Sequence, residues 1–353
     1  MFGALRFLLA YLVVLSHLVG SAYVLHFGFY AVRGFFVISG FIITSALNEV
    51  YHFDGKRFWI NRMLRLLPPY YLICVLTLAA VAWLPDQAGQ FLKLWNHPAH
   101  TTDLLMNFLV LPLQFTTAQF RALPPYWSVA VEIVMYGLLW LVIARREVYA
   151  AIALGAGIVY HVACVDVGWA WDARYFTAPS ALLSFSAGAL VYFLRQRGVL
   201  TLGPGTTACA FVLWLANMIA GGTIFPDSYI FAEGYYIGTC CFAFLVAGLA
   251  GRTWPARLAA VDHALGRIAY PTFLLQWLVG FLVAVTLFPG VWRGWELTLV
   301  ATPALIALAC VVAQLHESVV EPLRRRVRNA SWPAGAGVPV PSPAGVPSNP
   351  PQL

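Results

Sequence analysis

Charged side chains are scarce in this sequence. Asp, Glu, Lys and Arg together make up 10% of the 353 residues, whereas 61% are hydrophobic, and the mean hydropathy is +0.77. A composition this poor in charge argues against a soluble enzyme, a disordered protein and a nucleic-acid-binding protein. We therefore expect an all-α, polytopic integral membrane protein.

Clusters of metal-ligating residues are also lacking. The six cysteines lie almost entirely inside apolar runs, and no two of them have C-x-x-C spacing. We interpret them as small hydrophobic core residues. The sequence therefore predicts neither a disulfide framework nor a zinc site, and we expect no bound metal or cofactor.

Long apolar runs are abundant instead. A hydrocarbon core about 30 Å thick needs about 20 apolar residues per helix. About ten such runs are present, at residues 3–25, 29–47, 66–85, 126–144, 148–168, 178–194, 205–224, 234–251, 268–288 and 297–315. The segment 103–115 is shorter and contains Pro112, so we expect an interfacial or re-entrant piece there.

The distribution of basic residues predicts the topology. With ten crossings and the loop 48–65 in the cytoplasm, most Lys and Arg residues are cytoplasmic, and the exceptions outside are Lys93, Arg121, Arg174 and Arg293. This asymmetry follows the positive-inside rule and predicts that both termini are cytoplasmic. We assign residues 1–328 to a transmembrane domain and 329–353 to a Pro-rich, disordered cytoplasmic tail.

Two ionisable residues lie on one face of the first predicted helix. Arg6 and His17 are eleven residues apart, which places them about 16 Å from each other along a helix axis. Ionisable groups inside a membrane are costly and mark candidate functional sites. His17 is a candidate general base, because imidazole titrates near neutral pH. The alternative is that Arg6 contacts lipid headgroups and His17 hydrogen-bonds a neighbouring helix.

A second deep charge is Glu132. Its predicted depth in the membrane matches that of His17, and Ser128 precedes it by four residues on the same helix face. A carboxylate there would orient the imidazole or a polar acceptor. The alternative is an ion pair between Glu132 and Arg33, which enters from the same side.

A basic segment follows the second predicted helix. In a helical projection Arg57, Arg62 and Arg65 fall within a sector of about 140°, opposite apolar side chains. We expect this segment to lie along the inner membrane interface. Its arginines either contact headgroups and set the topology, or bind the phosphates of a cytosolic nucleotide-containing ligand.

These features resemble, in order, the motifs of the membrane-bound acyltransferase-3 family, whose best-known members O-acylate bacterial surface sugars. The resemblance covers most of residues 4–328. It rests on four motifs, which are Arg6-x10-His17, the FFxxSGF helix at 35–41, the basic segment Arg57-x4-Arg62-x2-Arg65-x2-Pro68, and Trp127-Ser128-x3-Glu132.

Three positions depart from the family's pattern. No acidic residue precedes Arg6, Arg33 stands where relatives commonly carry an acid, and Gln276 stands where they often carry His. We count Ser39, Ser128, Arg33 and Gln276 as candidate acceptor-site or supporting residues.

The resemblance implies a bacterial inner-membrane enzyme that moves an acyl group, expected to be acetyl, from cytosolic acyl-CoA to a hydroxyl of a cell-surface or lipid-linked sugar. Acyl-CoA would be a co-substrate, and membrane lipid would surround the protein. His17 would be the general base with Glu132 orienting it, and the donor would be bound by Arg6, Arg57, Arg62 and Arg65. Ser39 or Ser128 could carry the acyl group, but direct transfer needs no covalent serine.

The alternative hypothesis is that the protein is a polytopic exporter or flippase, which moves a glycan or acylated substrate without acyl-transfer chemistry. Ten helices with polar groups at mid-depth suit such a transporter. The sequence shows no internal repeat, which favours the enzyme.

Overall fold

The computed structural model describes residues 2–21, 24, 26–96, 101–110, 119–224 and 233–329. All regular structure within these residues is helical, as the composition predicts. Six stretches are long and apolar enough to cross a membrane. They are α3 with η1 (Phe27–Ser45, Ala46–Tyr51), α4 (Gly55–Trp83), α8 (Glu147–Asp166), α9 with α10 (Trp171–Tyr175, Ala178–Gln196), α14 (Ala256–Leu287) and α15 (Trp295–Val319).

Four shorter apolar helices accompany them. These are α1 (Gly3–Leu18), α7 (Tyr126–Leu141), α11 (Pro204–Thr223) and α13 (Glu233–Leu249). Each predicted run overlaps one of these ten helices, although α1 ends at Leu18, before the predicted end of its run, and α4 begins at Gly55, before the predicted start of its run. The number of crossings and the side of the membrane that holds the termini stay predictions. The remaining short elements are α5 (Pro85–Phe91), η2 (Lys93–Trp95), α6 (Thr101–Leu109), η4 (Ile143–Arg145) and α16 (Glu321–Asn329).

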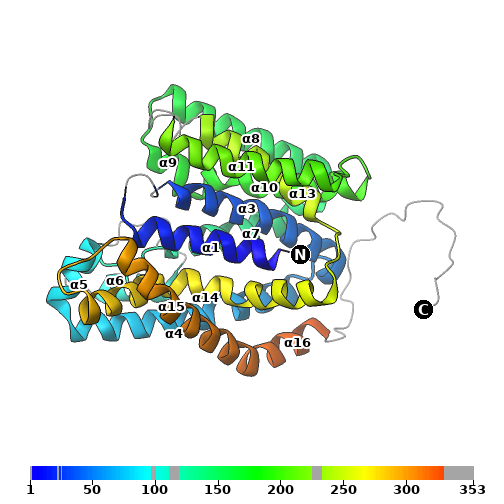
Figure 1. The fold of residues 1–353 in the computed structure, drawn as a ribbon. Coiled ribbons are helices and arrows are strands. Elements are labelled where there is room, and N and C mark those ends of the chain that lie inside the picture. Colours follow the sequence, from blue (N-terminus) through cyan, green and yellow to red (C-terminus); the bar gives the residue numbers. More distant parts are fainter. Residues whose placement is uncertain are drawn as a thin grey trace.

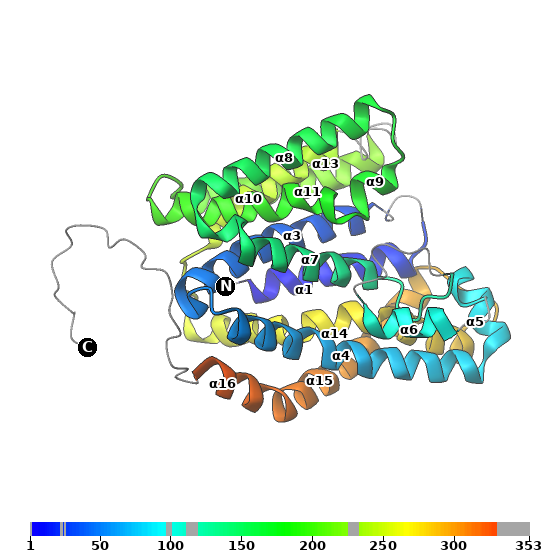
Figure 2. The same ribbon diagram turned by 180° about the vertical axis from the view of Figure 1, so that it is seen from behind.

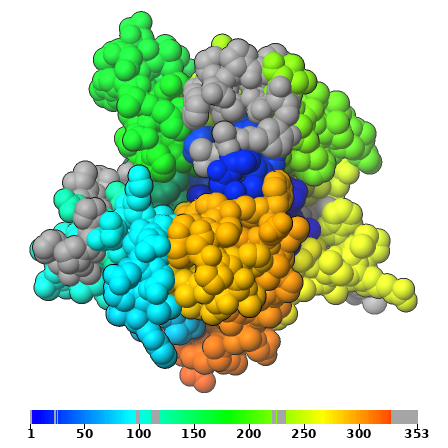
Figure 3. Space-filling view, turned by 60° about the vertical axis from the view of Figure 1, so that its left-hand side comes forward, coloured from blue at the N-terminus to red at the C-terminus, as the bar shows by residue number. Residues whose placement is uncertain are grey.

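The helices run roughly side by side, and α1 lies inside the bundle (Figures 1 and 2). It packs against α14 on one side and α3 on the other, while α10 joins α3 to α8, and α13 joins α3 to α11. In the space-filling view of Figure 3, the blue N-terminal residues show only a small area above α15 (orange). More than half of the residues of α1 are buried, so the helix that carries Arg6 and His17 lies largely inside the protein.

Glycines allow the central helices to approach closely. A Cβ added to Gly40 of α3 would lie 2.1 Å from the carbonyl oxygen of Phe185 on α10, and one added to Gly188 would lie 2.1 Å from that of Val37. The two helices therefore cross with their backbones in contact, as small residues permit between membrane helices.

The beginning of α1 is capped from a distant part of the chain. The carboxylate of Asp262, on α14, accepts hydrogen bonds from the backbone N–H groups of Gly3 at 3.2 Å and Ala4 at 2.9 Å. These donors lack partners within the helix, and a negative charge also complements the helix dipole there. Asp262 thus places an acidic group beside the start of α1, where the sequence before Arg6 has none.

The basic segment and the apolar run that follows it form a single helix, and the expected position of the segment at the inner interface stays a prediction. Residues 55–83 form one continuous helix, α4, with Pro68 and Pro69 inside it. A proline lacks an N–H and leaves the carbonyl four residues earlier without its helical donor. For Pro68 that carbonyl belongs to Leu64, and Nε2 of His316 on α15 donates to it at 3.1 Å. A neighbouring helix thus replaces the missing bond, so α4 continues through the prolines.

Two predicted segments are only partly described. For the stretch 103–115, α6 ends at Leu109, and residues 111–118 lie outside the described part of the chain. Residues 330–353, which hold almost all of the predicted tail, also lie outside it.

Candidate functional site

A narrow cavity of about 100 Å³ lies inside the bundle, between α1, α3, α4, α7 and α14. It gathers most of the polar residues that the sequence singles out. They are Arg6, Ser39, Arg62, Arg65, Ser128 and Glu132, and two tyrosines, Tyr136 and Tyr270, complete the polar lining. Each of the four sequence motifs therefore contributes at least one residue to this cavity, although the motifs lie on four different helices.

Three guanidinium groups meet at this cavity. Arg6 comes from α1, whereas Arg62 and Arg65 lie within one turn of each other on α4. Arg62 is buried, and its guanidinium lies 5.9 and 5.8 Å from the ring centroids of Tyr51 and Phe58. Within the described residues, the buried Nε atoms of Arg6 and Arg62 have no hydrogen-bond acceptor. Buried charge without acceptors is costly, so the cluster is suited to an anionic ligand.

Glu132 supplies the carboxylate of the cavity. Its Oε1 accepts hydrogen bonds from Ser39 Oγ at 2.7 Å and from Tyr136 OH at 2.9 Å. In the described part of the chain it is hydrogen-bonded neither to His17 nor to Arg33, so neither contact expected from the sequence is formed. Sequence reasoning missed Tyr136, although its spacing of four residues from Glu132 places both on one helix face.

His17 lies in a separate chamber of about 80 Å³, which it lines together with Trp127 of α7 and Tyr175 of α9. Its Nδ1 lies 3.0 Å from Oε1 of Gln276 on α14. The imidazole ring also packs on Trp277, with 5.0 Å between the ring centroids. Partners from α14 therefore hold the ring of His17.

Arg293 covers this end of the bundle from the loop before α15. Its guanidinium lies 4.9 Å from the ring centroid of Trp277 and 4.4 Å from that of Phe91. Burial lowers the pKa of Arg293 to about 10, which leaves the side chain charged at neutral pH. A positive charge therefore lies against the same ring, that of Trp277, on which His17 packs.

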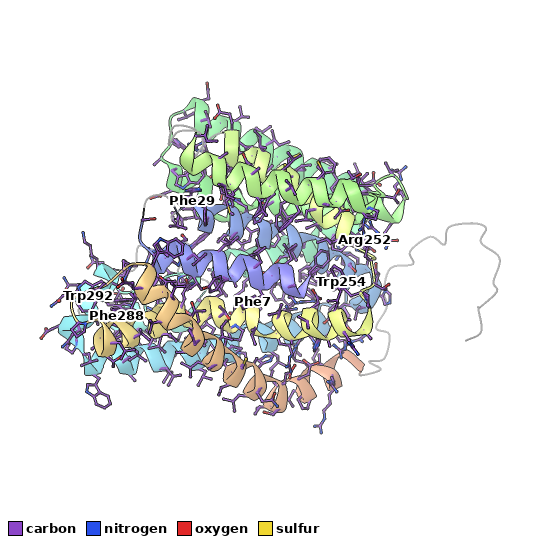
Figure 4. The ribbon with its side chains drawn as sticks, viewed as in Figure 1. Phe7, Phe29, Arg252, Trp254, Phe288 and Trp292 are labelled. Carbon is purple, nitrogen blue, oxygen red and sulfur yellow. The ribbon has the colours of Figure 1, made fainter. Side chains whose placement is uncertain are left out.

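A wide basin of about 800 Å³ opens where α1 begins. Side chains of α14, α15, α16 and the loop before α14 line it, among them Trp254, His263, Arg267 and Arg324. Figure 4 shows Trp254 at this end of the bundle and Phe29, which lines the His17 chamber, toward the opposite end. Sequence reasoning missed the basin, because its walls come from segments far apart in the chain.

The three spaces adjoin one another. The basin and the narrow cavity share five lining residues, and the cavity and the chamber share two. The shared residues are Arg6, Ile42, Arg65, Gly266 and Tyr270 for the first pair, and Val32 and Phe273 for the second. Basin, cavity and chamber therefore follow one another from the Arg6 end of α1 to the His17 end.

Arg57 lies apart from this series of spaces. Its guanidinium donates hydrogen bonds to the carbonyl oxygens of Val327, at 3.4 Å, and Arg328, at the end of α16. The last carbonyls of a helix lack internal donors and favour a cation. The structure thus gives Arg57 a helix-capping contact and does not bring it to Arg6, Arg62 and Arg65.

Arg33 also lies outside the cavity. It is buried, and it donates hydrogen bonds to the backbone oxygens of Ser180 at 2.8 Å and Arg174 at 2.6 Å. Its guanidinium lies 4.6 Å from the ring centroid of Tyr235. These contacts join α3 to the segment that contains α9, which forms one wall of the His17 chamber.

The comparison with protein families identifies the class of this site. A family model described as an acyltransferase domain, of the acyltransferase-3 type, matches residues 2–316. The match contains all residues of the narrow cavity and the His17 chamber, whereas α16 lies beyond it. Comparisons with curated proteins and with solved structures gave no match.

Proposed function

This multi-pass membrane protein belongs to the acyltransferase-3 family, and from this premise we propose that it moves an acyl group from cytosolic acyl-CoA to a hydroxyl of a cell-surface or lipid-linked sugar. The simplest acyl group is acetyl, and the proposed location is the bacterial inner membrane. Acyl-CoA acts as a co-substrate in this reaction and not as a resident cofactor.

One observation carries the proposal, namely that the basin, the narrow cavity and the chamber adjoin one another in series and so offer a passage through the bundle. The basin is the widest of the three and lies at the end that we propose to be cytoplasmic. It accommodates a nucleotide, whereas the narrow cavity suits only a thin chain such as the pantetheine arm. The guanidiniums of Arg6, Arg62 and Arg65 line the passage and complement the phosphates of the donor.

The reaction itself takes place at the His17 end of this passage. We propose that His17 accepts the proton of the acceptor hydroxyl while the hydroxyl oxygen attacks the thioester carbonyl. The C–S bond then breaks, and the thiolate of coenzyme A takes the proton from the imidazolium. No covalent acyl-enzyme is needed, because donor and acceptor meet in one site.

Glu132 acts on the donor side in this proposal. Its carboxylate is hydrogen-bonded to Ser39 and Tyr136 within the narrow cavity. It therefore positions polar side chains along the donor's path and partly balances the nearby guanidiniums, instead of orienting His17. Ser128 lines the same cavity, but its hydroxyl donates to the carbonyl of Pro125 at 2.9 Å.

Two measurements on the purified protein test this function. Acyl-CoA should bind with micromolar affinity, and His17→Ala should abolish acyl transfer while leaving acyl-CoA binding unchanged. His52→Asn is the matched control, because His52 is exposed in a turn and has the left-handed backbone conformation that Asn tolerates.

Two results would contradict the proposal. Near-normal transfer by His17→Ala would remove His17 from the chemistry. A complete lack of acyl-CoA binding by the wild-type protein would instead favour the exporter or flippase, which needs no acyl donor.

A further inference from the structure

The partner of His17 is an amide whose orientation is fixed. Gln276 is fully buried on α14. Its Nε2 donates a hydrogen bond to the carbonyl oxygen of Phe273 at 2.8 Å, and its Oε1 faces Nδ1 of His17 at 3.0 Å. An amide oxygen can only accept a hydrogen bond, and the NH₂ group of Gln276 already donates to the carbonyl oxygen of Phe273. Nδ1 of His17 is therefore the protonated nitrogen.

This contact determines which nitrogen of the imidazole is basic. A neutral imidazole carries one proton, so a proton on Nδ1 leaves the lone pair on Nε2. The ring of His17 is also held by its packing on Trp277 and lines the chamber formed with Trp127 and Tyr175. Gln276 and Trp277 of α14 thus fix both the tautomer and the position of the His17 ring before any ligand binds.

We propose that Gln276 is the positioning residue of the reaction, which holds His17 with Nε2 free to take the proton of the acceptor hydroxyl. This inference rests on the proposed function of His17 as a general base. It also assigns the acceptor's hydroxyl to the chamber beside Trp127 and Tyr175, on the Nε2 side of the ring. The volume of about 80 Å³ admits only the hydroxyl-bearing tip of an acceptor, not a whole sugar ring.

A glutamine performs only part of what a carboxylate would do in this position. Its oxygen fixes the tautomer, but a neutral amide gives little stabilisation to the imidazolium that forms after proton transfer. Within the described residues, the other charged or titratable groups near the ring are Arg293, which packs on Trp277, and Tyr175, which lines the chamber. Neither supplies a negative charge at neutral pH, so the imidazolium readily returns its proton to the leaving thiolate.

Two substitutions at this position separate positioning from packing. Gln276→Leu keeps a side chain of similar size but removes the acceptor, and it should lower kcat by roughly 10 to 100-fold, as the loss of an orienting partner typically does. The KM for acyl-CoA should stay within twofold of the wild-type value, because Gln276 lines neither the basin nor the narrow cavity.

Gln276→Glu restores an acceptor and adds a charge. It should keep kcat within a few-fold of the wild-type value. Because a carboxylate stabilises the imidazolium and the reaction needs the neutral base, the acidic limb of the pH–rate profile should move to higher pH. If Gln276 served packing alone, Gln276→Glu should lower kcat as much as Gln276→Leu does, and the acidic limb of the pH–rate profile should not move.

Nitrogen NMR of ¹⁵N-histidine-labelled protein tests the tautomer without reference to activity, with His17→Ala identifying the His17 signals. The wild type should show a protonated Nδ1 and an unprotonated Nε2, and Gln276→Leu should lose this preference. A wild-type ring protonated on Nε2, or an unchanged kcat in Gln276→Leu, would overturn the inference. An active His17→Ala would instead overturn the proposed function, whatever the tautomer.

Discussion

At the scale of single residues, the guanidiniums give the most direct prediction. If Arg62 binds a donor phosphate, Arg62→Ala removes a charge-assisted hydrogen bond of about 1.5 to 3 kcal/mol and should raise the dissociation constant of acyl-CoA roughly tenfold or more. Arg62→Lys should rescue little of this loss, because an ammonium cannot reproduce the planar fork. Titration of acyl-CoA into the purified variants measures both effects.

The control for this titration is Arg326→Ala. Arg326 is exposed on α16 and lines neither the basin nor the narrow cavity, so its loss should leave affinity unchanged. Wild-type affinity in both Arg62 variants would show that the basic segment of α4 serves only folding and topology.

Single residues also show which parts of the site can be predicted from the sequence and which cannot. Arg6, His17 and Glu132 are identifiable from the sequence, because a charge or an imidazole inside an apolar run is conspicuous and costly. The pairing of His17 with Gln276 and the capping of α1 by Asp262 are not identifiable, since these two residues lie on α14 and contact α1 only after folding. For this reason the expected pairing of Glu132 with His17 was wrong, although both residues line adjoining spaces.

At the scale of helices, the crossing of α3 and α10 depends on Gly40. A Cβ there would lie 2.1 Å from the carbonyl oxygen of Phe185, which belongs to the backbone and cannot rotate away. Gly40→Ala should therefore reduce stability by roughly 1 to 3 kcal/mol, as overpacking typically does. Thermal unfolding in detergent measures the change.

Gly155 provides the matched control for that experiment. It lies on the exposed side of α8, and a Cβ there would meet no atom within 4 Å. Gly155→Ala should leave the stability unchanged or raise it by up to about 1 kcal/mol through helix propensity. Equal melting temperatures for the two variants would show that the close crossing is not required.

The positions of the helices can be predicted from the sequence, but some of their details cannot. Apolar runs predict where each helix lies, because burial in lipid demands them. The continuity of α4 through Pro68 and Pro69 is not predictable in this way. It depends on the hydrogen bond from His316 to the carbonyl of Leu64, which joins positions 252 residues apart in the chain.

At the scale of the whole molecule, the arrangement of the three spaces connects topology with function. The start of α1 and α16 lie at the same end of the bundle (Figures 1 and 2), and the basin opens there. Acyl-CoA is a cytosolic compound, so the proposed function requires this end to face the cytoplasm. The positive-inside rule predicts the same orientation independently, since α16 carries Arg324, Arg325, Arg326 and Arg328.

Cysteine labelling in a variant without the six native cysteines tests this orientation. Arg326→Cys, on α16, should react with a membrane-impermeant maleimide only in inverted vesicles, whereas Val291→Cys, in the exposed loop before α15, should react on intact cells. The two sites lie at opposite ends of α15, so the pair controls for leaky membranes. The reversed pattern would place the basin outside the cell, where the donor is absent, and would contradict both the topology and the donor path proposed for it.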